Sequence, residues 1–215
     1  MTKTSSLKGV PSEIKQVLNW ELSDYQYQQF LSKGIIFLQG EIEEEMSFEF
    51  AHELIHVTRL DPPMDGDRKK PIWVILDSPG GDVFAGFAIH DMIRSAVAGG
   101  AEINILGKGL MASMATVVLQ AATKRFTLPY TQFLVHEVSQ SIFEIGEKVS
   151  EGEERVEESK RINRIVMGII AKRVGMNVDD LIKISKKKDC WFDADGALKL
   201  GEHGLVDQVI EALPF

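Results

Sequence analysis

The sequence contains one cysteine, Cys190, among 215 residues. A framework of disulfides within the chain is therefore excluded, and a reducing compartment is expected. No apolar run approaches the roughly 18 residues of a membrane helix, and the polar first residues lack the apolar core of a secretory signal. Basic residues are also scarce, because 24 Lys and Arg oppose 32 Asp and Glu for a net charge of −8. We therefore expect a cytoplasmic protein whose main partner is neither nucleic acid nor a membrane.

What is present is typical of a globular protein. Hydrophobic residues make up 44% and charged residues 26% of the chain, enough to bury a substantial core. There is no internal repeat and no low-complexity linker. We expect an N-terminal arm at residues 1–26 and a single domain over residues 27–215.

Apolar runs and helical periodicities alternate along the chain. Strands are expected at residues 34–38, 72–76, 103–106, 125–128, 132–136, 191–192 and 205–210, and helices at 48–60, 83–98, 113–122, 147–174, 177–185 and 195–200. This alternation predicts an α/β fold built from βαβ units. The helix at 147–174 has an apolar stripe in its second half only. It either projects to meet a partner subunit or is a long surface helix with a solvated acidic end.

Two short segments carry the signals for chemistry. Ser78-Pro79-Gly80-Gly81 follows the buried strand 72–76, and Ser113 stands where a loop enters the helix 113–122. A serine at a helix start lies near free N–H groups, and the Gly-Gly turn offers more of them. A nucleophile beside N–H donors is the arrangement that acyl transfer requires. Taken alone, however, such a serine is more often a cap or a packing residue.

A histidine and an aspartate could complete a catalytic triad with this serine. His136 ends the apolar run 133–135, and Asp189 directly precedes the strand at 191–192. Both stand at strand ends, where side chains can face a site built from loops. Each residue also has a non-catalytic interpretation: His136 as a capping histidine and Asp189 as a surface aspartate. A triad is defined by geometry and not by chain order.

A competing pattern, His52-Glu53-x-x-His56, lies on the predicted helix 48–60. On a helix it places two imidazoles on one face for zinc, with the glutamate as base. The longer zinc-peptidase pattern does not follow, because Arg59 and Pro62 occupy its glycine and third-histidine positions. A zinc metallopeptidase therefore stays an alternative.

Five motifs in order resemble the Clp protease proteolytic subunit (ClpP) family of serine peptidases. The resemblance begins near Tyr27 and extends almost to the C-terminus. The matching segments are Gly34–Ile42, Leu76–Gly81 with Asp77 in place of the family's Asn, Ala112–Ala115, Leu134–His136 and Gly204–Asp207.

The resemblance implies Ser113 as nucleophile, His136 as general base and Asp189 as the residue that orients the imidazole. It also implies that the N–H groups of Gly81 and Met114 form the oxyanion hole, and that no cofactor or metal takes part. The implied fold is a crotonase-like spiral of ββα units, with residues 147–174 as the protruding handle helix.

The implied assembly is a heptameric ring, single or stacked as a tetradecamer, that cleaves protein or peptide substrates and is fed by a hexameric AAA+ ATPase. Departures from the family include Cys190 in place of an arginine, Glu137-Val138 in place of Gln-Pro, and Ser139–Phe143 in place of a glycine-rich strand. Trp73 and Ile75 partly match the family's ATPase-docking aromatics. A non-catalytic ring-building subunit remains an alternative, and an acyl-CoA enzyme of the crotonase superfamily is a weaker one.

Overall fold

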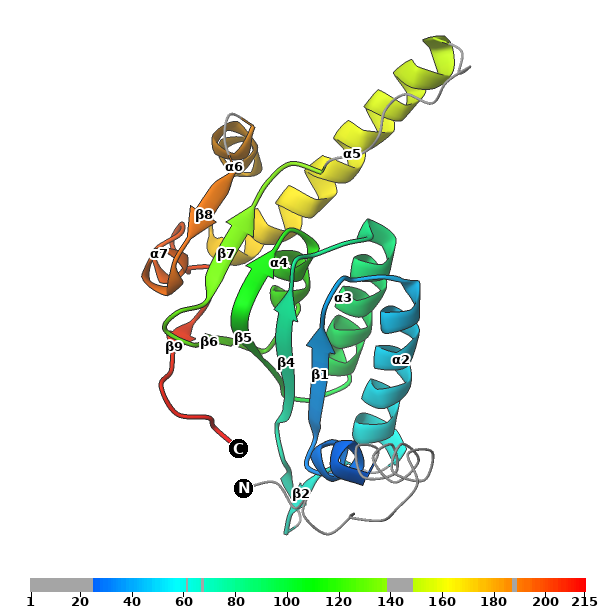
Figure 1. The fold of residues 1–215 in the computed structure, drawn as a ribbon, viewed down its shortest axis with the longest axis vertical. Coiled ribbons are helices and arrows are strands. Elements are labelled where there is room, and N and C mark those ends of the chain that lie inside the picture. Colours follow the sequence, from blue (N-terminus) through cyan, green and yellow to red (C-terminus); the bar gives the residue numbers. More distant parts are fainter. Residues whose placement is uncertain (1–24, 61, 67, 139–148, 187–188) are drawn as a thin grey trace, which may run out of the picture.

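The computed structural model describes residues 25–60, 62–66, 68–138, 149–186 and 189–215. Its centre is a mainly parallel sheet (Figure 1). The order is β1-β4-β5-β6-β9, with β1 at Ile35–Gln39, β4 at Ile72–Ser78, β5 at Ile103–Ala112, β6 at Lys124–Thr127 and β9 at Gln208–Val209. Strand β7 (Gln132–Val135) pairs in parallel with the last residues of β5, and β8 (Cys190–Phe192) is antiparallel to β7.

Helices follow the strands and cover one face of the sheet. They are α2 (Glu44–Ile55), which continues as a π-helical turn η2 (His56–Leu60), α3 (Val83–Ala98), α4 (Met114–Leu119), α5 (Val149–Val174), α6 (Val178–Ser185) and α7 (Ala194–Leu198). Residues 25–31 are also helical. Asp82 caps α3 by accepting the Ala85 N–H at 2.7 Å, and Gly99 directly follows its last turn. Figure 1 shows α2 and α3 beside β1 and β4, and α5 projecting away from the sheet.

The main core lies between this sheet face and the helices. Strand alternation sends Ile36, Val74 and Ile105 into it, where they meet Phe50 and Leu54 of α2. The second half of α5 supplies Ile162, Val166, Met167 and Ile170 to the same core. Of the apolar stripe predicted for this helix, Ile162, Val166 and Ile170 are thus buried within the chain itself, whereas Ile165 is exposed. A smaller apolar cluster occupies the other face of the sheet.

A buried arginine joins the C-terminal segment to the sheet. The Arg125 guanidinium, on β6, donates to the Asp207 carboxylate, to Gln120 Oε1 at 2.7 Å and to the carbonyls of Gly204 and His203. Burial by itself raises the pKa of Asp207. The hydrogen bonds that Arg125 donates and its positive charge outweigh burial and hold the pKa below its usual value.

The α/β class and the long helix near 147–174 are confirmed, and the architecture agrees with the crotonase-like spiral. Some boundaries were wrong. The helix expected at 48–60 begins at Glu44, and the serine helix ends at Leu119. The loop before β4 contains a two-stranded hairpin, β2 (Met64–Asp65) and β3 (Arg68–Lys69), that the sequence analysis missed.

The strand expected at 205–210 shrinks to Gln208–Val209 because the backbone before it bonds elsewhere. The Leu205 N–H donates to the Ala197 carbonyl, and the carbonyls of residues 203 and 204 accept from Arg125.

Most of the arm expected at 1–26 and the departure at Ser139–Phe143 lie outside the described residues. Within the described part of the chain, no helix has the length and apolarity to span a membrane.

Candidate active site

Ser113 stands in a strained turn between β5 and α4. Its φ of 55° and ψ of −123° make it the one residue other than glycine with positive φ in the described part of the chain. Such a conformation costs on the order of 1–3 kcal/mol and persists only where the surroundings impose it. A strand ending in a sharp turn before a helix exposes the serine hydroxyl in the nucleophile elbow of α/β-hydrolases. Ser113 is half-buried at the first turn of α4.

The Gly80-Gly81 turn lies directly against this elbow. A Cβ on Gly80 would lie 2.6 Å from the Ser113 Cβ and 2.9 Å from the Met114 nitrogen, and one on Gly81 would lie 2.2 Å from the Ile42 carbonyl oxygen. Ile42 anchors the turn, because its N–H donates to the Gly80 carbonyl and its carbonyl accepts the Asp82 N–H, both at 2.7 Å. Close backbone approach and positive φ therefore require glycine at both positions.

Two N–H groups remain for a ligand. Within the described residues, neither the Gly81 N–H nor the Met114 N–H donates a hydrogen bond. Met114 is the first residue of α4, where an N–H has no acceptor in its own helix. The two residues line one pocket together with Ser113. This arrangement can stabilise negative charge on an oxygen bound there.

Strand β7 brings His136 to the same pocket. Its Leu134 pairs with Ala112 in the ladder, and the Ser113 N–H donates to the Leu134 carbonyl at 2.9 Å. His136 follows one residue after β7 and is half-buried. The pocket, of about 70 Å³, is lined by Gly81, Val83, Ser113, Met114, Thr116, Val135, His136, Val138, Val166 and Ile170. The structure thus brings together four of the five residues expected at the site.

Asp189 lies near this pocket but does not line it. In the antiparallel β7–β8 ladder Val135 pairs with Cys190, so the next pair outward would match His136 with Asp189. Asp189 is exposed, and the described residues contain no hydrogen bond that joins it to His136 or joins His136 to Ser113. The register therefore places Asp189 at the strand end beside His136, without a side-chain hydrogen bond between the two among the described residues.

Asp77 braces the backbone that leads to the serine. Its carboxylate accepts from Lys108 Nζ at 2.8 Å and from the Leu110 N–H at 3.0 Å, which ties the end of β4 to β5 just before Ser113. Burial raises the pKa of Asp77, but the hydrogen bonds from Lys108 and Leu110 and the lysine charge outweigh burial and lower it below its usual value. The residue that departs from the family pattern therefore has a local ion-pair partner in Lys108.

Sequence reasoning missed the contributions of α5 to the site. Val166 and Ile170 line the pocket from this helix, and the Asn163 side-chain oxygen accepts the Val138 N–H at 3.1 Å. Asn163 thereby holds the segment that follows His136. The helical spacing of these residues was visible in the sequence, but the partner of the apolar stripe was not.

The residues of the His52-Glu53-x-x-His56 pattern contact aromatic side chains and not further metal-ligating groups among the described residues. Glu53 accepts a hydrogen bond from the Tyr27 hydroxyl, and the His52 ring packs on Phe48 with centroids 4.2 Å apart. Burial raises the pKa of Glu53 above its usual value, against the opposing effect of the Tyr27 hydrogen bond. Among the described residues, no three His, Cys, Asp or Glu side chains are grouped to hold a metal ion. The two histidines therefore have no third ligand in that part of the chain.

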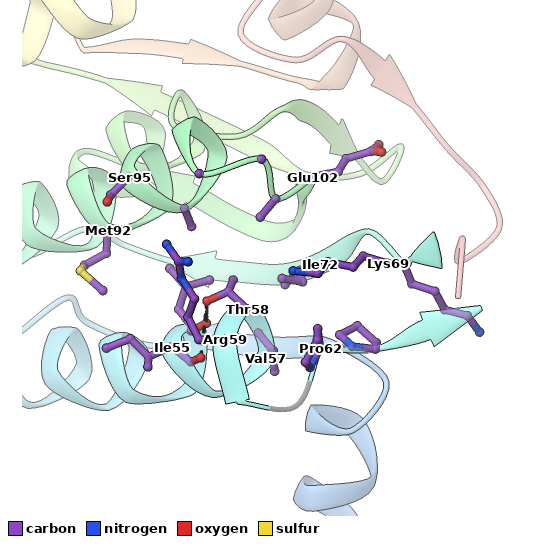
Figure 2. A pocket seen from close by; sticks show the side chains of 17 residues that line it. Ile55, Val57, Thr58, Arg59, Pro62, Lys69, Ile72, Met92, Ser95 and Glu102 are labelled. Carbon is purple, nitrogen blue, oxygen red and sulfur yellow. Dashed lines mark hydrogen bonds between the residues drawn. The ribbon is translucent and has the colours of Figure 1, made fainter. Parts of the chain in front are cut away.

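A larger pocket of about 390 Å³ lies at the opposite end of β4, between η2 and the end of α3. Figure 2 shows Arg59 reaching across it from η2, with Ser95 and Met92 on the α3 side. Its described lining includes Lys69 and Glu102 but neither a histidine nor an aspartate. Pocket size alone therefore does not identify the candidate site, because Ser113, His136 and the N–H groups of Gly81 and Met114 all line the smaller pocket.

Comparison with known proteins agrees with this geometry. The family model for Clp protease matches residues 20–212. The chain is 32% identical to the ATP-dependent Clp protease proteolytic subunit 2 of Treponema denticola, over 85% of this chain and 84% of that protein. It is 31% identical to the proteins of the same name from Corynebacterium diphtheriae, over 89% of each chain, and Nocardia farcinica, over 98% of this chain and 95% of the other. The chain belongs to the Clp protease family.

Proposed function

We propose that this chain is a serine endopeptidase that hydrolyses peptide bonds of unfolded proteins or peptides. The observation that carries the proposal is the strained Ser113, which lines one pocket with His136 and with two N–H groups that donate to nothing else in the described residues. A conformation that costs free energy is retained where it serves chemistry, and here it presents a hydroxyl beside a base.

The mechanism follows from the roles of these groups. Ser113 Oγ attacks the substrate carbonyl carbon while His136 takes the hydroxyl proton, and the N–H groups of Gly81 and Met114 stabilise the oxyanion. His136 then protonates the leaving amine, which departs and leaves an acyl-serine. Water, deprotonated by His136, hydrolyses this ester and regenerates the serine.

Asp189 is proposed as the residue that orients His136. Its position one pair beyond the Val135–Cys190 pair supports this role, because residues directly opposite on antiparallel strands have neighbouring side chains. The absent hydrogen bond is also the specific observation that favours the second candidate, a non-catalytic ring-building subunit. The two functions predict opposite outcomes for chemical labelling of the serine.

The test is intact mass after treatment with a fluorophosphonate, which reacts with a serine only when base and oxyanion hole are in place. We expect one adduct on the parent chain and none on Ser113→Ala. Ser95→Ala, which changes an exposed serine in the other pocket, is the matched control and should be labelled like the parent. Asp189→Asn should slow labelling by about two orders of magnitude or more, because the imidazole loses its orienting partner. An unlabelled parent would favour the structural subunit.

We further propose that the chain assembles into a heptameric ring, single or stacked, and is fed by a hexameric AAA+ ATPase. The support is family membership, the protruding α5 and the names of the relatives, which are ATP-dependent Clp protease proteolytic subunits. Cys190, in the position of the family's arginine, makes the double ring the first feature to test. Light scattering of the purified protein separates monomer, heptamer and tetradecamer.

A further inference from the structure

The segment that follows His136 is tied to α5 by a single hydrogen bond. The Val138 N–H donates to Asn163 Oδ1 at 3.1 Å, and both residues are half-buried. Within the described part of the chain, no other side-chain hydrogen bond and no backbone hydrogen bond outside the sheet reaches residues 136–138. His136 therefore stands between two anchors, the β7 ladder directly before it and Asn163 two residues after it.

Asn163 lies on the face of α5 that borders the candidate site. Val166 and Ile170 follow it at spacings of three and seven residues, so all three share one side of the helix. Those two apolar residues line the pocket, and Val138 lines it from the segment after β7. Figure 1 shows α5 passing the end of β7. A shift of the backbone at Val138 would therefore reach both the pocket wall and His136.

The chemistry of the two groups shows what the bond replaces. A backbone N–H can only donate, so the Asn163 side chain must present its oxygen, and not its NH₂ group, to Val138. The family pattern has proline at this position, which has no N–H and whose ring fixes φ at about −65°. Valine lacks that covalent restraint. The hydrogen bond from α5 thus supplies from outside the segment a restraint that proline would supply from within it.

We propose that Asn163 is a positioning residue for the peptidase reaction. It acts through the Val138 backbone, which keeps His136 where it can take the proton of Ser113. Among the described residues no side chain is hydrogen-bonded to the imidazole, so the backbone on either side sets its position. The role in catalysis rests on the proposed function, whereas the anchoring of His136 does not.

The size of the effect follows from the part that a general base plays. Such a base contributes about 10² to 10⁴ to the rate, and a misplacement on the order of 1 Å can cost about a hundredfold. Loss of one of two anchors shifts the base without removing it. We therefore expect the chemical step to slow by about ten- to a hundredfold.

Asn163→Leu and Asn163→Asp separate the acceptor oxygen from the bulk of the side chain. Leucine has a similar volume but cannot accept the N–H, whereas aspartate keeps an acceptor oxygen. In second-order fluorophosphonate labelling of Ser113, Asn163→Leu should lose about ten- to a hundredfold and Asn163→Asp less than about threefold. Asn177→Leu is the matched control, because Asn177 Oδ1 accepts the Asp179 N–H at 2.8 Å at the start of α6. It should lower stability in urea without slowing the labelling.

Val138→Pro removes the donor of the same bond. Asn163→Leu should slow the parent but should not slow further a chain that carries Val138→Pro, since proline has no N–H for Asn163 to accept. Additive losses would contradict a shared hydrogen bond. In peptide hydrolysis, kcat should fall with KM nearly unchanged. A higher KM with normal labelling would mean that Asn163 only shapes the substrate pocket, and it would overturn the proposal.

The position of His136 can also be followed without any activity. In chains that contain ¹³C-histidine, Asn163→Leu should shift or broaden the His136 resonance and Asn163→Asp should restore it, with the exposed His203 as internal reference. A parent that does not react with the fluorophosphonate, but whose His136 resonance responds to Asn163→Leu, would refute only the peptidase. A reactive parent in which Asn163→Leu changes neither the labelling rate nor this resonance would refute only the role of Asn163.

Discussion

Gly80→Ala tests whether the site depends on the close approach of two turns. The added Cβ would lie 2.6 Å from the Ser113 Cβ, 2.8 Å from the Ala112 carbonyl oxygen and 2.9 Å from the Met114 nitrogen. Two of these three neighbours are backbone atoms, which cannot rotate away as the end of a side chain would. The serine turn must therefore shift, and with it the proposed oxyanion donor of Met114.

Two separate costs are expected. Gly80 has a φ of 94°, and a residue with a side chain in that region costs on the order of 1–3 kcal/mol of folding stability. Displacing one oxyanion donor costs about 10² to 10³ in the rate of the chemical step. Gly40 is the control that separates the stability cost from the rate cost. Its φ of 99° is also positive, but a Cβ there would meet nothing within 4 Å. Gly40→Ala should lose stability and keep its reactivity.

The assay is the second-order rate of fluorophosphonate labelling at Ser113, measured beside urea unfolding of each variant. We expect Gly80→Ala to lose at least about a hundredfold in labelling rate and Gly40→Ala to lose less than about threefold. Both variants must be folded under the labelling conditions, which the urea curves establish. Equal labelling of the two variants would refute the reasoning, because the clash would then have no effect on the serine or its donors.

Two further predictions concern other parts of the chain. Asp207→Asn removes the charge that compensates the buried Arg125 and should cost about 2–3 kcal/mol in urea unfolding, below the usual cost of a broken buried pair because the carboxylate is 38% exposed. Glu157→Gln, in an exposed ion pair with Lys160, should have no measurable effect. Because the Asp207 pKa is lowered by folding, this stability is fully present above the unfolded-state pKa and is lost as the pH falls through the folded one, so the variant and parent should converge in acid. Separately, His52→Ala should leave peptide hydrolysis unchanged and a chelator should not inhibit the parent; inhibition by both would revive the zinc peptidase.

Local sequence was sufficient where a short segment determines its own structure. The Gly-Gly turn, the end of α3 at Gly99 and the serine at the start of α4 all follow from backbone requirements of a few adjacent residues. The pairing of distant segments could not be obtained in this way. His136 and Asp189 are 53 positions apart in number, and their proximity depends on the register of β7 against β8. Strand-end position marked each of the two residues as a candidate, but the family resemblance gave them their roles in one site.

The burial of Arg125 likewise depends on contacts with distant residues and could not be obtained from local sequence. In the sequence it is a charged residue in an alternating strand, which is typical of a solvated position. In the structure its side chain is almost fully buried, because six side-chain hydrogen bonds, three of them to the Asp207 carboxylate, replace water. Those acceptors come from residues 120 and 203–207, and the same contacts shorten the last strand. One long-range network therefore buries Arg125 and also shortens the strand that the sequence predicts at 205–210.

The run Ile72–Leu76 raises the remaining question of what covers the second face of the sheet. An apolar residue at every position predicts a strand that is buried on both sides. The structure meets this expectation on the helix side, where Ile72, Val74 and Leu76 join the main core. On the other side Trp73 and Ile75 join a smaller cluster, where the Phe215 ring contacts Trp73 and the Phe30 ring contacts Phe37. The apolar pattern of β4 therefore matches burial on both faces, but the second face obtains that burial mainly from its own strands and strand-end residues and not from a layer of helices.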